Sequence, residues 1–211
     1  AREMASHRPA TIVHPGRRVN WYGDDTQRSR GIALLNALLG NYGRKGGLYV
    51  AQGISMAPYG LNKYPEHARH RLDGAEADRY PFADEGITTS IRDATVSGKP
   101  YPIKGWFVYS TNLMQALPSE AETIKAIQNL DLLVVCETMP SEMAGWADVI
   151  LPDTIFLERH DELLTGFGRN GWAALRQPVV AAPHDQKPAW WIAKELANKL
   201  GIGECMPFKD L

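Results

Sequence analysis

Two adjacent arginines, Arg17 and Arg18, follow a glycine turn at Gly16. Guanidinium groups donate bidentate, charge-assisted hydrogen bonds, so two of them behind such a turn can bind an anionic substrate. The alternative is that they form a solvated surface pair, or a salt bridge to Asp24 or Asp25. We favour the substrate-binding interpretation for Arg17 and leave both interpretations open for Arg18.

Three further groups of polar residues each follow a short apolar run, as ligand-binding groups do where a strand ends. The runs are residues 106–109, 132–136 and 149–151, and the polar groups are Ser110-Thr111-Asn112, Glu137-Thr138 and Pro152-Asp153-Thr154. In open α/β sheets, ligands bind beyond the carboxyl ends of the strands, where helix N-termini offer free N–H groups to phosphates. Glu137 at that edge can accept hydrogen bonds from guanine or from a ribose. The alternative is that all three groups are ordinary caps and turns.

The elements that must position these groups have the pattern of a parallel α/β sheet. The apolar runs are typical of strands that are buried on both faces, as parallel strands usually are. Residues 119–122 have the Ser-x-x-Glu spacing of a capping box, so a helix should begin there and connect the first two strands. Residues 11–14 should form another strand of the same sheet. The predicted fold is therefore α/β, with a mostly parallel sheet flanked by helices.

Further elements lie on both sides of this region in the sequence. A helix should end just before Gly40, and the last helix should begin with Pro188 in its first position. A pair of short strands around a glycine-rich turn is expected within residues 164–180. Residues 51–104 contain many glycines and prolines. We therefore expect a single α/β domain over residues 1–211, with a long irregular excursion within it.

The composition excludes several classes of protein. With 44% hydrophobic and 22% charged residues, the chain is typical of soluble globular proteins. Its net charge of −1 argues against a nucleic-acid-binding protein that works through its overall field. No apolar run is long enough to span a membrane, and no signal peptide opens the chain. The two cysteines, Cys136 and Cys205, cannot by themselves frame a disulfide scaffold or an iron–sulfur cluster.

Several motifs together resemble one known family. The run Ala147–Pro152 reads ADVILP and resembles a signature of the molybdopterin oxidoreductases of the dimethyl sulfoxide reductase family. Residues 110–115 occupy the place of that family's G-x-N-P loop, although Leu113 stands where proline is usual. Residues 164–169 resemble its FTNTEGR element. The resemblance extends from about residue 3 to about residue 200, and over residues 13–47 it is closest to the polysulfide and thiosulfate reductase branch.

The resemblance implies a function for a longer protein of which this chain is an internal piece. That protein would be the catalytic subunit of a molybdenum oxidoreductase with a bis(molybdopterin guanine dinucleotide) cofactor, and this piece would hold one guanine dinucleotide arm. The expected reaction is reductive cleavage of polysulfide, thiosulfate or tetrathionate. Two alternatives stay open: a reductase of another oxyanion such as arsenate or selenate, and a free-standing nucleotide-binding α/β module without redox activity. The molybdenum ligand and the iron–sulfur cysteines would lie elsewhere in the parent chain, so the piece alone should be inactive.

The resemblance also implies which residues form the site and which partners surround it. Arg17 and Arg18 would lie near the metal, where neither ligates it. His14 is either a core or hinge residue or a contact to the pterin. The expected contacts to the cofactor are His14, Gly16, Ser110, Thr111, Asn112, Gln115, Glu137, Thr138, Asp148, Thr165 and Arg169. Expected partners are the remaining domains of the parent subunit, an iron–sulfur electron-transfer subunit and a membrane anchor subunit, with a periplasmic location at the membrane and no nucleic acid.

Overall fold

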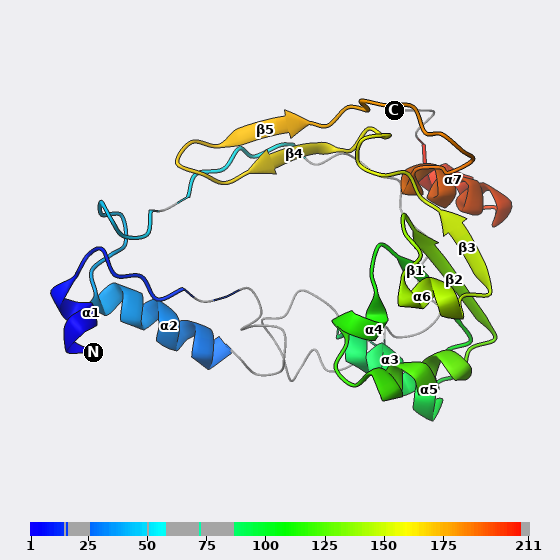
Figure 1. Ribbon diagram of the computed structural model, residues 1–211, viewed down its shortest axis with the longest axis horizontal. Coiled ribbons are helices and arrows are strands. Elements are labelled where there is room, and N and C mark those ends of the chain that lie inside the picture. Colours follow the sequence, from blue (N-terminus) through cyan, green and yellow to red (C-terminus); the bar gives the residue numbers. More distant parts are fainter. Residues whose placement is uncertain (15, 17–25, 50, 58–71, 73–86, 208–211) are drawn as a thin grey trace. The chain divides into compact units, whose positions relative to one another are not determined.

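The computed structural model describes residues 1–14, 16, 26–49, 51–57, 72 and 87–207 (Figure 1). The chain divides into two compact units where the sequence predicts one domain. Unit 1 comprises Ala1–Ala57 and Leu163–Ala174, and unit 2 comprises Pro58–Glu162 and Leu175–Leu211. The predicted catalytic residues Arg17 and Arg18 lie outside the described residues.

Unit 2 contains a three-stranded parallel sheet, which confirms the predicted α/β class. Its strands are β1 (Gly105–Tyr109), β2 (Leu132–Glu137) and β3 (Val149–Pro152), in the order β1-β2-β3. Val108 of β1 pairs with Val135 of β2, which in turn pairs with Ile150 of β3. All three strands lie where the apolar runs predict them, because short runs that are rich in β-branched and aromatic residues and bounded by polar residues favour strands.

Three helices cover one face of this sheet. They are α4 (Leu113–Ala116), α5 (Glu120–Gln128) and α6 (Glu142–Trp146), which follow the strands in the β-α-β order of parallel sheets (Figure 1). They place Met114, Ile127 and Met143 against three strand residues, Val108, Leu133 and Val135. Leu133 is only 1% exposed, and burial of a side chain of this size contributes roughly 1.5–3 kcal/mol.

The opposite face of the sheet is only partly covered, so the prediction that the strands are buried on both faces is wrong. Phe107 of β1 is 49% exposed, and Tyr109 and Val149 are similarly exposed. In a strand, successive side chains point to opposite faces, which is why Val108 is buried between Phe107 and Tyr109. An apolar sequence therefore identified the strands without specifying what covers each face.

The remaining helices of unit 2 differ from the predictions in detail. Helix α3 (Thr88–Ser97) lies within the stretch predicted to be irregular, and it packs on α5. Helix α5 begins after Ser119 as predicted, but Ser119 has φ 63° and its side chain makes no capping hydrogen bond. Helix α7 (Ala189–Lys199) begins one residue later than predicted, because Pro188 is its N-cap and not its first residue. The 3₁₀ helix η1 (Gly203–Cys205) follows it. None of the helices in the described part of the chain has the length and apolar character needed to cross a membrane.

Unit 1 contains helices α1 (Arg2–Ser6) and α2 (Thr26–Leu38) and the strand pair β4 (Leu163–Gly166) and β5 (Trp172–Leu175), whose last residue belongs to unit 2. Gly40 has φ 64° after α2, so it ends this helix as predicted. Residues 11–14 form no strand and join no sheet, contrary to the prediction. Instead, Asn36 and Asn41 bind this segment through their side chains.

The β4–β5 pair confirms the predicted strands around a glycine-rich turn. Gly166 leaves room for a neighbouring aromatic ring, because a Cβ atom at this position would lie 2.0 Å from the ring of Trp172. Gln52 pairs with Gly168 in an antiparallel bridge, with backbone N···O distances of 2.9 and 3.1 Å. The turn is therefore tied to the segment around Gln52 within unit 1.

Candidate functional site

The polar residues that follow the three strands meet at one edge of the unit 2 sheet. Because β1, β2 and β3 are parallel and in register, their last residues Tyr109, Glu137 and Pro152 lie at the same edge. We refer to this edge, with the residues that directly follow each strand, as the carboxyl edge. In parallel α/β sheets it is the usual place for a ligand.

The segment after β1 is held by the carboxylate of Glu142, the first residue of α6. Ser110 adopts a left-handed conformation with φ 51°, and the Asn112 side chain accepts a hydrogen bond from the Met114 backbone N–H as the N-cap of α4. The Asn112 amide also donates to Glu142, and the Gln115 amide donates to the other oxygen of the same carboxylate at 2.8 Å. The amide nitrogen of each of these two residues therefore donates one hydrogen bond to Glu142.

These hydrogen bonds stabilise the ionised form of the Glu142 carboxyl. Hydrogen bonds from its own backbone N–H and from the Asn112 and Gln115 amides hold the pKa of the Glu142 carboxyl below its usual value of 4.5. The carboxylate joins the loop after β1 to the start of α6, and thereby fixes two of the loops that border the carboxyl edge. Nothing in the spacing of these residues predicts this contact.

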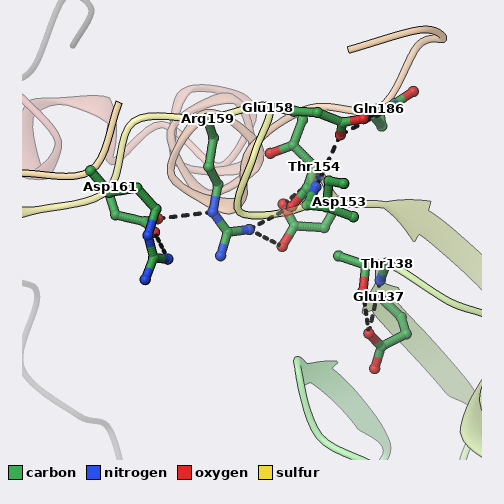
Figure 2. Close-up of polar contacts among 10 residues, drawn as sticks. Glu137, Thr138, Asp153, Thr154, Glu158, Arg159, Asp161 and Gln186 are labelled. Atoms are coloured by element: carbon green, nitrogen blue, oxygen red, sulfur yellow. Dashed lines mark hydrogen bonds and ion pairs between the residues drawn. The ribbon is translucent and has the colours of Figure 1, made fainter. Parts of the chain in front are cut away.

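At the end of β2, Glu137 is half-buried and has one oxygen oriented by the chain. Its Oε1 accepts hydrogen bonds from the Thr138 backbone N–H at 2.8 Å and the Thr138 hydroxyl at 3.3 Å (Figure 2). The Oε2 atom has no hydrogen-bond partner among the described residues. A carboxylate with one oriented oxygen and one available oxygen can accept from adjacent donors on a ligand, such as the N–H groups on one edge of guanine.

At the end of β3, Asp153 and Thr154 are buried. The Asp153 Oδ1 atom accepts from the Thr154 backbone N–H at 2.8 Å, and Oδ2 accepts from Arg159 at 2.9 Å. Thr154 is 2% exposed, and its hydroxyl has no hydrogen-bond partner among the described residues. A buried hydroxyl without a hydrogen-bond partner costs free energy of folding. Such a group at the carboxyl edge is therefore a reason to expect a ligand or an ordered water there.

The face of the sheet that carries Tyr109 holds two groups whose acidity is reduced. Burial raises the pKa of the Cys136 thiol from 9.0 to about 11, and the nearby carboxylates of Asp153 and Glu137 act in the same direction. Burial and the charge of Asp153 also raise the pKa of Tyr109. Both groups stay protonated at neutral pH, so Cys136 acts as a small apolar side chain here.

The other predicted contact residues lie elsewhere. His14 and Gly16 belong to unit 1, where the exposed His14 ring accepts from the Gly16 backbone N–H at 2.9 Å, so His14 is not a core residue. Thr165 and Arg169 also belong to unit 1, with Thr165 in β4 and Arg169 exposed in the turn that follows. Asp148 precedes β3 at the opposite end of the sheet, where its carboxylate accepts from the Leu133 backbone N–H at 2.7 Å. Asp148 therefore joins two strands and is not brought to the carboxyl edge.

Arg159 is the residue of this region that sequence patterns missed. It lies in the charged run 158–162. Such a run does not by itself show which acidic residues pair with the arginine. In the structure Arg159 contacts Asp153 and Asp161 (Figure 2). Among the described residues, no group of three or more histidine, cysteine, aspartate or glutamate side chains could hold a metal ion.

Comparison with known proteins identifies the family. The model of the family described as "Molybdopterin oxidoreductase" matches residues 4–199. The thiosulfate reductase molybdopterin-containing subunit of Salmonella typhimurium is 35% identical over 224 aligned residues, which cover 100% of this chain and 30% of that subunit. A tetrathionate reductase subunit of the same organism is 27% identical over 73% of this chain and 18% of its own length.

A solved structure shows the same fold. Acetylene hydratase from Pelobacter acetylenicus superposes with a TM-score of 0.52 at 25% sequence identity, over 66% of this chain and 20% of its own. The chain thus spans less than a third of the length of these relatives.

Proposed function

The chain belongs to the molybdopterin oxidoreductase family, and we propose that it forms part of a catalytic subunit that reductively cleaves sulfur–sulfur bonds in polysulfide, thiosulfate or tetrathionate. The observation that carries this proposal is the 35% identity to a thiosulfate reductase molybdopterin-containing subunit over the whole of this chain. The similarity to a tetrathionate reductase subunit supports the same class of substrate.

We also propose that the carboxyl edge binds one guanine dinucleotide arm of a bis(molybdopterin guanine dinucleotide) cofactor. The residues present fit such a group. Glu137 offers an acceptor to the guanine N–H groups, and the buried Thr154 hydroxyl lacks a hydrogen-bond partner among the described residues. The hydroxyls of Ser110 and Thr111 are further donors for a ribose or a phosphate oxygen, and the Thr138 hydroxyl, which donates to Glu137, can accept from a ribose hydroxyl.

The role of the chain in this function is to bind and orient. When bound, the molybdenum centre supplies the electron-transfer chemistry, while the protein supplies position, hydrogen bonds and electrostatics. The Glu137 carboxylate orients the base, and the Asn112–Glu142 contact holds the loop from which Ser110 and Thr111 extend. His14, Gly16, Thr165 and Arg169 belong to unit 1, and their contacts to the cofactor stay predictions.

Arg17 supplies the electrostatic part of the proposed reaction. Cleavage of a sulfur–sulfur bond leaves negative charge on the departing sulfur, and a guanidinium near that atom stabilises the charge more in the transition state than in the ground state. Arg17 therefore lowers the barrier as well as the Michaelis constant. Arg18 is the alternative residue for this role.

The surroundings of the subunit follow from the same premise. We propose that the rest of the parent subunit carries the molybdenum ligand and the iron–sulfur cluster. An iron–sulfur electron-transfer subunit and a membrane anchor subunit complete the assembly, on the periplasmic side of the membrane.

The test is turnover by the full-length enzyme with reduced viologen as electron donor and rates normalised to molybdenum. We expect turnover with polysulfide, thiosulfate or tetrathionate and little with arsenate or selenate. A preference for arsenate would instead support the relationship to the arsenate respiratory reductase subunit of Chrysiogenes arsenatis, which is 25% identical over 94% of this chain. Purified enzyme that contains guanine nucleotide but no molybdenum would favour a nucleotide-binding module without redox activity.

A further inference from the structure

Four charged side chains form a continuous series of ion pairs at the carboxyl end of β3. We call Asp153, Arg159, Asp161 and Arg176 the β3-end network. Arg159 donates from Nη1 to Asp153 Oδ2 at 2.9 Å and from Nε to Asp161 Oδ1 at 2.8 Å. Arg176 donates to the other oxygen of Asp161. Figure 2 shows the Arg159 guanidinium between the two aspartates.

The inner half of the network is shielded from water. The side chain of Asp153 is 3% exposed and that of Arg159 is 20% exposed, while Arg176 at the outer end is 44% exposed. Burial opposes the charge on Arg159, but the hydrogen bond to Asp161 and the charges of both aspartates raise the pKa of the guanidinium above its usual value. Arg159 therefore remains charged at neutral pH, and screening by salt is weaker there than at the surface.

The guanidinium fixes backbone as well as side chains. The Nη1 atom of Arg159 also donates to the Thr154 backbone carbonyl at 2.7 Å, so one residue holds both the Asp153 carboxylate and the peptide unit after Thr154. The backbone N–H of Asp161 donates to the carbonyl of Arg176 at 3.4 Å, which adds a main-chain contact to their ion pair. Arg159 thus connects the end of β3 to the two places where the chain leaves and re-enters unit 2.

The charges of the network cancel. It contains two carboxylates and two guanidinium groups, so its net charge is zero. Without Arg159, the buried carboxylate of Asp153 would have no cationic partner within the network. A buried carboxylate without a partner repels an anion that approaches the same edge, and the low polarity of the site strengthens the repulsion.

We propose that Arg159 is a positioning residue for the cofactor: it holds Asp153 and Thr154 in place at the carboxyl edge and cancels the carboxylate charge that would repel the diphosphate of a guanine dinucleotide. This inference rests on the proposed function, because it requires the dinucleotide arm to bind at this edge. Arg159 acts through Asp153 and Thr154, without contact to the reacting atoms.

A purely structural role for Arg159 predicts a different outcome. If the network only stabilised the fold, its loss would lower the thermal stability of the protein, and folded molecules would retain the cofactor as the wild type does. The positioning role predicts faster loss of cofactor from molecules that are still folded. The electrostatic part of the role further predicts that salt slows this loss only in variants that leave a net negative charge.

The test uses full-length, cofactor-loaded enzyme and measures the guanine nucleotide that remains bound during dilution at low and at high salt. Arg159→Met leaves Asp153 without its partner. Arg159→Lys keeps the charge, but its single ammonium group cannot span Asp153 and Asp161 as the guanidinium does. The double variant Asp153→Asn with Arg159→Met removes both charges. The matched control is Lys104→Met, which breaks an exposed ion pair to Asp131 at the opposite end of the sheet.

We expect Arg159→Met to lose guanine nucleotide roughly five- to tenfold faster than the wild type at low salt, the effect of one unit charge several ångströms away at intermediate dielectric. High salt should reverse part of this loss. Arg159→Lys and the double variant should also lose nucleotide faster than the wild type, with no such dependence on salt. Lys104→Met should behave as the wild type.

Retention of nucleotide by Arg159→Met at the wild-type rate in both salt conditions would overturn the inference, and so would an equal response to salt in all three variants. If Arg159→Met does not fold, the other two variants decide, because wild-type retention in both of them is incompatible with the positioning role. Wild-type enzyme that contains no guanine nucleotide would contradict the proposed function itself. That result needs no variant, so the two failures are distinguishable.

Discussion

The side chain of Asn36 binds both backbone polar groups of Val13. Its Oδ1 atom accepts from the Val13 N–H at 3.0 Å, and its Nδ2 atom donates to the Val13 carbonyl at 2.8 Å. A neighbouring β-strand would provide the same pair of contacts, so one asparagine replaces a strand for the segment that precedes His14. Asn41 adds a hydrogen bond to the Thr11 carbonyl at 2.8 Å and another to Asn36 itself.

We expect Asn36→Leu to lower the free energy of unfolding by about 1–3 kcal/mol, because the Val13 N–H and carbonyl lose their partners in a partly buried place. Urea unfolding gives the change in free energy, and hydrogen exchange should show faster exchange of the Val13 amide. Ser6→Ala in the exposed helix α1 is the control and should change neither. An unchanged Val13 amide in Asn36→Leu would contradict the proposed replacement of a strand.

The two faces of the unit 2 sheet should respond differently to truncation. Leu133→Ala removes a side chain that is buried against α4–α6, and we expect a loss of about 2–5 kcal/mol. Phe107→Ala on the opposite face removes a side chain that is 49% exposed, so it should cost clearly less. Equal losses in urea unfolding would show that the opposite face is buried in solution.

The raised pKa of Cys136 predicts a loss of stability at high pH. The pKa of the thiol is 9.0 in the unfolded chain and about 11 in the folded protein. Its contribution to the free energy of unfolding is therefore fully present below pH 9 and is lost as the pH rises through about 11. We expect the free energy of unfolding to fall more steeply above pH 9 with Cys136 than in Cys136→Ala, both measured with Cys205 replaced by alanine. Identical pH dependence in the two proteins would contradict a protected thiol.

Glu137 should determine how much cofactor the full-length enzyme binds. Glu137→Ala leaves guanine donors without an acceptor, which costs roughly 1–3 kcal/mol of binding free energy. We expect the guanine nucleotide and molybdenum content of the purified variant to fall, most clearly after dilution. Glu120→Ala, at an exposed position in the first turn of α5, is the control. Unchanged occupancy in Glu137→Ala would remove Glu137 from the proposed site.

Arg17 should determine the rate of the proposed reaction. In the full-length enzyme we expect Arg17→Ala to reduce turnover by roughly 10²–10³, by analogy with removal of one oxyanion donor, while Arg17→Lys keeps part of the activity. Cofactor content should stay normal in both variants. Arg18→Ala is the matched comparison: a large loss there and none in Arg17→Ala would assign the role to Arg18, and two nearly silent variants would place both arginines on the surface.

The sequence by itself determined the three parallel strands and the order of the elements that connect them. Residues 132–136 are a compact apolar run between polar boundaries, and the ADVILP run indicates the family together with residues 110–115 and 164–169. Such features are local, because the residues that define a strand or a helix end lie within a few positions of one another. The carboxyl edge followed from these strands, since parallel strands necessarily end together.

Only the tertiary structure decided how this edge is supported. The partners of Arg159 lie at positions 153 and 161, and Arg176 completes the network from beyond the β4–β5 pair. Asn36 likewise binds Val13, which lies 23 positions earlier. The residues 11–14, which were predicted to be a strand, are thus held by side chains and not by a neighbouring strand. Contacts across such separations depend on how the chain folds back on itself. Hydrophobic periodicity and capping patterns contain no information about those distances, and so they could not predict which charges pair or which face of the sheet is covered.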